Sequence, residues 1–202
     1  MNNCIFANKC TRQICDNSCP TFIESDYLLS RNNISIQSDV FRADMNQIMS
    51  CNDFFDRHTS GLVTVLTKSS ISASQLLAYV AICRNWKGNR LHCSVYHLKL
   101  SSYLDAMQLS WSTKTAPEEF EYQDIWIRTS KILIVSGLDF INFKDFQAQT
   151  LLNMIHERTS NRLLTVVVSP PTSLLIGDRA KSAFFTRLTS VLSESSDTEV
   201  HV

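Results

Sequence analysis

Three short apolar runs constrain the fold of this chain most strongly. Gly61–Leu66 (GLVTVL), Lys131–Val135 (KILIV) and Leu163–Val168 (LLTVVV) are rich in Val, Ile and Leu. Strands have such continuous apolar runs when helices cover both faces of a parallel sheet. A fourth run, Leu91–His97 (LHCSVYH), also has the composition of a strand.

Apolar residues at helical spacing lie between and after these runs. The expected helices cover about Ala73–Asn85, Leu98–Leu109, Phe143–Arg158 and Ala180–Leu192. The alternation of strands and helices predicts a three-layer α/β domain with a parallel sheet over residues 60–193. Before it we expect a cysteine-rich segment (1–36) and a polar helical linker (37–59), and after it a polar tail (194–202).

Charge and hydropathy argue against several classes of protein, although a local basic patch would suffice to bind nucleic acid. The formal net charge is zero, so no overall field attracts nucleic acid or an anionic membrane. No apolar run approaches the roughly 18 residues of a membrane-spanning helix. The N-terminus, MNNCIFANKC, is too polar for a secretory signal. We therefore expect a cytoplasmic protein in a reducing compartment, with no membrane partner.

The N-terminal segment carries four cysteines in the pattern C-x5-C-x4-C-x3-C, namely Cys4, Cys10, Cys15 and Cys19. In a reducing compartment, clustered thiols bind metal more often than they form disulfides. Four thiolates suit the tetrahedral geometry of Zn²⁺, and the metal would supply folding energy to so short a segment. The alternative is four free cysteines on a flexible arm. For the other three, Cys51, Cys83 and Cys93, we expect packing in the core.

The stretch after the first strand has the length of a phosphate-binding loop. A P-loop places G-x-x-x-x-G-K-[ST] between a strand and a helix, so that backbone N–H groups and the lysine contact phosphate. Here the stretch reads TKSSISAS. Thr67 and Ser72 occupy the glycine positions, Ala73 the lysine position, and Ser74 alone keeps a hydroxyl at the magnesium position. Because these changes remove the lysine and add bulk, we expect no tight binding of ATP.

A second site of P-loop ATPases is altered as well. Their central strand ends in one or two acidic residues that hold magnesium and polarise the attacking water. Here KILIV is followed by Ser136 and Gly137, and the first acid is Asp139. Asp139 is either a displaced ligand or a helix-capping or turn residue. After LLTVVV, Ser169 stands where a polar sensor residue such as asparagine is expected.

The stretch KILIVSGLDFINFKDFQAQTLLNMIHERTSNRLLTVVVSP resembles the replicative helicase loaders of bacteria and phages, of the DnaC/DnaI type. These are AAA+ ATPases related to the IstB transposition helpers. Glu157 and Arg158 match a glutamate–arginine pair of that family. Gly177-Asp178-Arg179 and Thr186-Arg187-Leu188 resemble its late Gly-Glu-Arg and Ser-Arg-Leu elements. The resemblance covers about Gly61 to Leu192, and the cysteine-rich segment resembles the zinc segment of some members.

The resemblance implies a degenerate AAA+ domain that acts in DNA replication of a phage or mobile element without hydrolysing ATP. Its expected partners are the replicative helicase or another replisome protein, contacted by the zinc segment, and an active AAA+ paralogue. Arg187 would correspond to the arginine finger that completes a neighbouring subunit's active site. The alternative for Arg187 is a solvated helix arginine.

Two other functions fit the sequence. One is a weak ATPase that uses Lys68, Ser74 and Asp139. The other is a module that binds single-stranded nucleic acid through the zinc segment, with basic residues near aromatic ones. Those residues are Lys9, Arg12 and Arg31, with Phe6 and Phe22. The histidines, including His92 and His97, have no spacing typical of metal ligands, and no G-x-S-x-G nucleophile motif occurs.

Overall fold

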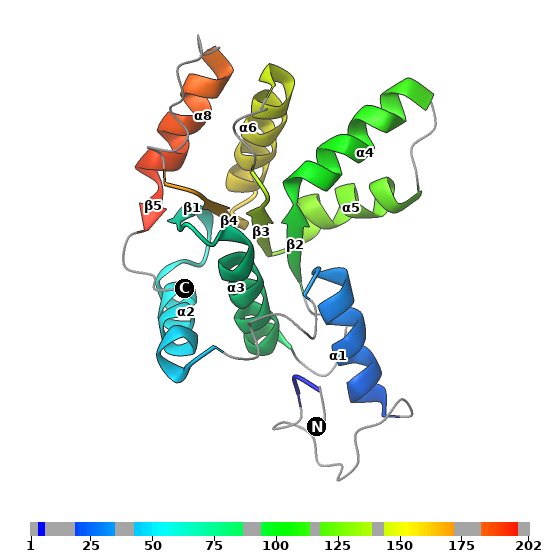
Figure 1. The fold of residues 1–202 in the computed structure, drawn as a ribbon, viewed down its shortest axis with the longest axis vertical. Helices are drawn as coiled ribbons and strands as arrows, with labels where there is room; N and C mark the ends of the chain where they lie inside the picture. Colours follow the sequence, from blue (N-terminus) through cyan, green and yellow to red (C-terminus); the bar gives the residue numbers. More distant parts are fainter. Residues whose placement is uncertain are drawn as a thin grey trace.

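The computed structural model describes residues 4–6, 19–34, 43–86, 94–113, 118–138, 144–171 and 183–197. These residues form a mixed α/β fold around a five-stranded, all-parallel sheet in the order β2-β3-β4-β1-β5 (Figure 1). The strands are β1 (Gly61–Leu66), β2 (Val95–Lys99), β3 (Ile132–Ser136), β4 (Leu164–Ser169) and β5 (Ser196–Asp197). The helices are α1 (Pro20–Arg31), α2 (Met45–Arg57), α3 (Ser70–Asn85), α4 (Leu100–Thr113), α5 (Glu118–Thr129), α6 (Asp145–Ser160) and α8 (Ala183–Glu194).

Helices cover both faces of the sheet, which confirms the expected three layers. In β3, Ile134 packs in one buried cluster with α2 and α3. Its neighbours Leu133 and Val135 pack in a second cluster with α4, α5, α6 and α8. Successive side chains of a strand point to opposite faces, so a strand covered on both sides needs apolar residues at every position. The apolar runs of the sequence therefore predicted the centre of the sheet correctly.

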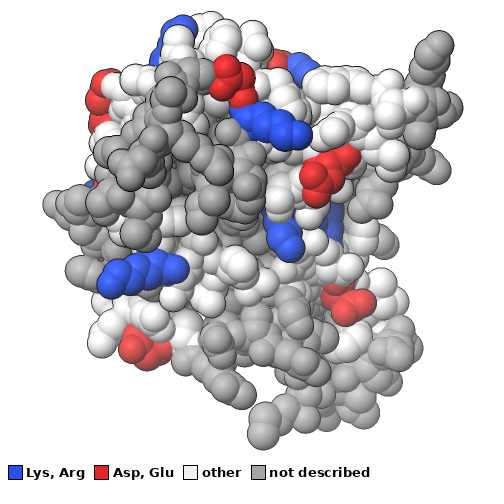
Figure 2. Space-filling model, turned by 45° about the horizontal axis from the view of Figure 1, so that its top comes forward, with Lys and Arg blue, Asp and Glu red and all other residues white. Residues whose placement is uncertain are grey.

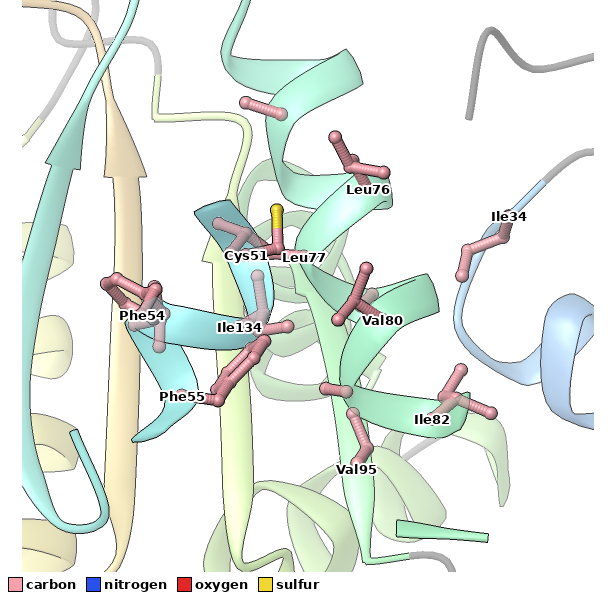
Figure 3. Packing of buried hydrophobic residues seen from close by; sticks show 14 of the residues in the cluster. Ile34, Cys51, Phe54, Phe55, Leu76, Leu77, Val80, Ile82, Val95 and Ile134 are labelled. Carbon is pink, nitrogen blue, oxygen red and sulfur yellow. The ribbon is translucent and has the colours of Figure 1, made fainter. Parts of the chain in front are cut away.

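The first cluster is a closed core. Phe54 of α2, Leu77 of α3 and Ile134 of β3 belong to this cluster (Figure 3), and all three side chains are fully buried. A reciprocal capping box fixes the start of α2, because Asp44 Oδ1 accepts from Gln47 N at 2.8 Å and Gln47 Oε1 accepts from Asp44 N at 3.1 Å.

The N-terminal segment joins this core through its described residues. Phe6 is fully buried and stacks on Trp86 at 4.0 Å between ring centroids. Leu28 and Leu29 of α1 and Ile34 belong to the same buried cluster as α2 and α3. Apolar packing thus holds α1 against the α/β body, and this packing does not require a metal at the cysteines.

Several element boundaries differ from those expected. The second strand runs from Val95 to Lys99 rather than from Leu91 to His97, and α4 begins at Leu100 rather than Leu98. Leu98 and Leu100 are both buried, so apolar pattern alone does not mark where strand becomes helix. Residues 91–93 lie outside the described ranges. In the expected polar tail, Ser196 and Asp197 pair with β1 as an edge strand. Among the described residues, no helix is both long and apolar enough to span a bilayer.

Candidate functional site

The sheet has a topological switch point between β1 and β4. These strands are parallel neighbours, paired from Gly61↔Leu164 to Leu66↔Ser169. The chain leaves β1 for α3 on one face, and after β4 the next described helix is α8 on the other face. In open α/β sheets, ligands bind outside the carboxyl ends of the strands at such a point. The expected nucleotide-binding positions follow β1 and β3, so the carboxyl edge of the sheet is the candidate site.

At the end of β1 the connection to α3 is short. Only Thr67, Lys68 and Ser69 separate the strand from the helix, which begins at Ser70, three residues before the expected start. Thr67 N donates to Ser169 O at 2.9 Å, and Ser69 N donates to Thr67 Oγ1 at 3.3 Å. The connection thus folds back on itself and on β4.

The positions that would hold phosphate and magnesium lie within α3. Ser72, Ala73 and Ser74 all belong to the helix. Ala73 is 2% exposed, and Ser74 is fully buried with its Oγ donating to Ile71 O at 2.8 Å. A side chain at position 73 therefore faces the core, and the hydroxyl of Ser74 is engaged within its own helix.

The ends of β3 and β4 carry hydroxyls that also point inward. Ser136 is 3% exposed and Ser169 is fully buried, with its Oγ donating to Pro170 O at 3.0 Å. Gly137 has φ +72, and a Cβ there would lie 3.2 Å from Lys99 Cγ. Glycine suits this position because its backbone adopts the left-handed region against a neighbouring side chain. Asp139 lies outside the described residues.

A buried histidine, which the sequence did not single out, adjoins this edge. His97 Nδ1 lies 2.7 Å from Asn32 O, and His97 Nε2 lies 2.8 Å from Ser136 Oγ. Burial lowers the pKa of His97 to about 4, so the ring is neutral at neutral pH. A carbonyl oxygen only accepts, so Nδ1 carries the proton and Nε2 accepts from the Ser136 hydroxyl. Asn32 Oδ1 also accepts from His97 N at 2.8 Å.

These contacts join three distant parts of the chain. Asn32 follows α1, His97 lies in β2 and Ser136 ends β3, at separations of 65 and 39 residues. A serine that donates to a neutral histidine has the arrangement of an activated nucleophile. However, both side chains are 3% exposed. In this conformation the trio is a latch that holds the end of α1 on β2. No spacing in the sequence indicates it, because it depends on tertiary contacts.

The cysteines divide between described and undescribed residues. Cys4 and Cys19 are both buried. Cys19 is the N-cap of α1, and Cys4 Sγ donates to Thr21 O in its first turn at 3.8 Å. Both thiols therefore lie at the amino end of α1, while Cys10 and Cys15 lie outside the described residues. Within the described residues, no three or more His, Cys, Asp or Glu side chains form a group that could hold a metal ion. Cys51 is in the core, as expected.

The Glu157–Arg158 pair separates into two roles. Arg158 is 1% exposed and donates to Ser130 O at 2.9 Å and to Leu164 O at 2.7 Å, which ties α6 to the start of β4. Burial lowers its pKa to about 10, so the guanidinium stays charged at neutral pH. Glu157 is on the surface, where both carboxylate oxygens accept from Arg128 at 2.7 Å.

Arg187 lies exposed on α8, at the rim of a groove between α6 and α8. The positions Thr67, Ser136 and Ser169 meet at the carboxyl edge of the sheet. Arg187 instead belongs to a helix that packs against α6 and β1. Arg187 therefore belongs to the α6–α8 groove, whose lining includes none of these three positions.

The aromatic residues expected to bind nucleic acid are largely in the core. Phe6 is fully buried, and Phe22 packs against the same cluster. Arg31 donates to Val95 O at 3.0 Å, with its guanidinium carbon 4.3 Å from the centroid of the Trp126 ring. Lys9 and Arg12 lie outside the described residues. On the face shown in Figure 2, charged side chains of both signs are scattered among uncharged ones.

No family model matches the chain, and no curated protein matches it.

Proposed function

We propose that this chain is a non-hydrolysing adaptor of the helicase-loader type, a pseudo-ATPase that acts through protein–protein contacts in the DNA replication of a phage or mobile element. In this proposal, the five-stranded parallel sheet and its helices form a degenerate AAA+-like domain with a P-loop topology. One observation carries the proposal. The sheet keeps a switch point, but the hydroxyl groups of Ser74, Ser136 and Ser169 near its carboxyl edge form hydrogen bonds within the protein.

Tight phosphate binding requires N–H groups and a cation that converge on open space. The connection after β1 has three residues and is bonded to β4, and Ala73 stands in the core where a lysine would be needed. Ser74 bonds within α3 and Ser136 bonds to His97. Both hydroxyls are also buried, so no magnesium ion reaches them from solvent in this arrangement. The same observation argues against a weak ATPase that uses Ser74, although Lys68 is exposed.

The zinc segment is the second part of the proposal. Cys4 and Cys19 lie at the amino end of α1, and the chain between them carries Cys10 and Cys15. Four thiolates would suit Zn²⁺, and the partial positive charge of a helix amino end favours thiolate. We propose that this segment, held against the body by Phe6 and α1, contacts the helicase or another replisome protein.

Arg187 supports a further contact within the same proposal. It is exposed on α8, and no described carboxylate pairs with it. An active AAA+ paralogue could receive this guanidinium in trans. The burial of Phe6 argues against the alternative of single-stranded DNA binding through Lys9 and Arg12, because a buried ring cannot stack on a base.

The test is calorimetry of ATP and ADP with the zinc-loaded full chain, together with metal analysis of the same sample. We expect no measurable nucleotide binding and about one zinc per chain, as a four-cysteine site requires. Micromolar nucleotide binding would contradict the proposal. If nucleotide binds, Lys68→Ala tells where: the variant should abolish binding at the loop after β1 but leave binding elsewhere unchanged. Arg162→Ala, a change of an exposed cation outside the loop, is the matched control.

A further inference from the structure

The seam between α6 and α8 is open. A groove of about 490 Å³ lies between these helices, with β1 at its floor. Its apolar lining comes from Leu62, Leu152, Ile155, Phe184 and Val191. Phe184 is 41% exposed, and Leu62 is only half-buried although it belongs to a central strand. The packing on this side of the sheet therefore leaves apolar surface that no described residue covers.

The polar lining of the groove is basic or neutral. Arg187 and His156 line it with three uncharged polar residues, and no lining residue is acidic. Asp145, at the start of α6, does not line the groove, and the other two acids of these helices have partners. Glu157 pairs with Arg128 toward α5, and Glu194 accepts from Ser190 at 2.8 Å. An apolar groove with a cationic rim complements an apolar surface that carries a carboxylate.

The chain presents such a surface at its other edge. On α5, Tyr122 is 57% exposed and Ile125 is 54% exposed, and these two residues are three apart and so share one helix face. Glu121 precedes them and is also exposed. Helix α5 packs beside β2, at one edge of the sheet, whereas α8 packs beside β1, toward the opposite edge (Figure 1). Helix α6 contacts both α5 and α8 and lies between them, so the exposed face of α5 and the groove lie on different sides of α6.

We propose that α5 of a second copy of this chain docks in the groove between α6 and α8. Tyr122 and Ile125 would enter the groove, and Glu121 would face Arg187. The contact is heterologous, because each copy offers its groove to one neighbour and its α5 to another. Assembly therefore continues beyond a dimer, into a ring or a filament. This inference does not rest on the proposed function, since it requires neither nucleotide nor zinc, but it assigns Arg187 to a second copy of this chain rather than to a paralogue.

The test is sedimentation of the full chain over a concentration series, without nucleotide. We expect concentration-dependent species larger than a dimer. Arg187→Glu and Glu121→Arg should each raise the dissociation constant roughly tenfold or more, because each places like charges opposite each other. The double variant, with both charges exchanged, should recover association. Lys131→Glu, a change of an exposed cation outside the groove, should associate like the parent protein.

Three results would overturn the inference. One is a monomer at every concentration, which would show that α5 of a second copy does not bind in the groove. Another is a dimer that does not grow further, or an assembly that Arg187→Glu leaves intact. The last is failure of the double variant to recover association while its circular dichroism matches the parent. Nucleotide calorimetry of the same preparations tests the adaptor function separately, so failure of one proposal does not imply failure of the other.

Discussion

The two faces of the sheet are closed in different ways. On the α2–α3 face, the central apolar side chains are shielded from solvent, and Phe54, Leu77 and Ile134 have no exposed surface. On the α6–α8 face, the buried guanidinium of Arg158 ties α6 to carbonyl groups of the neighbouring elements, and the seam beside α8 stays open. Directed hydrogen bonds at one end of a helix can hold it in place without closing its whole length.

Adjacent residues of β1 illustrate the difference. Val63 points to the closed face and is 5% exposed, whereas Leu62 points to the open face and is half-buried. Both residues belong to the same apolar run, GLVTVL. An apolar run indicates that a strand is covered on both faces, but the completeness of each cover depends on how the helices are spaced.

The largest expected effect comes from truncating one leucine on each face. Leu77→Ala removes a fully buried side chain from the closed face, and we expect a loss of about 3 kcal/mol in the free energy of unfolding. Leu152→Ala removes a half-buried side chain from the groove, where water already reaches, and should cost about 1 kcal/mol. Urea unfolding followed by circular dichroism measures both. Equal losses would show that the two faces are packed alike.

The sequence predicted the central strands better than the helices that cover them. Three strands were located to within one residue, because Val, Ile and Leu at every position indicate burial on both sides. Helices α1 and α5 were not expected. Pro20 at the first turn of α1, with Leu28 and Leu29 more than two turns later, was an available signal for the first of them. In α5, charged residues alternate with exposed Tyr122 and Ile125, so its apolar face is weakly defined.

The candidate site was predictable only in part. The replaced positions after β1 and β3 could be read from the sequence, because a P-loop has a fixed spacing. The start of α3 at Ser70 could not be predicted from the sequence, since Ser-rich stretches suit both a turn and the beginning of a helix. The latch of Asn32, His97 and Ser136 could not be predicted either, because His97 is 65 residues from Asn32 and 39 residues from Ser136. Their proximity follows from strand order, which local patterns do not specify.

The second prediction concerns that latch, which lies on the closed face. Protonation of His97 is disfavoured in the folded state, where its pKa is about 4, relative to the ordinary value of 6.5. The neutral ring therefore contributes its full stability above pH 6.5, and that contribution is lost as the pH falls toward 4. We expect a loss of roughly 2 kcal/mol between pH 7 and pH 5. Urea unfolding at both pH values measures it.

The matched variant for this prediction is His97→Gln, which keeps a polar side chain but does not titrate. It should be less stable at pH 7, since it disturbs the contacts to Asn32 and Ser136, but this part of the pH dependence should disappear. A parent protein with the same unfolding free energy at both pH values would contradict a buried, neutral His97.

The smallest expected effect comes from enlarging side chains rather than truncating them. Leu152→Phe adds volume where the groove is open, so the ring can enter it without displacing neighbours, and stability should change by less than about 0.5 kcal/mol. Leu77→Phe adds the same volume where no space exists and should cost about 2 kcal/mol through overpacking. If Leu152→Phe were as costly as Leu77→Phe, the groove would be closed in solution. If it is tolerated, the same variant also fills the proposed docking site for α5, so it should weaken assembly while leaving the fold intact.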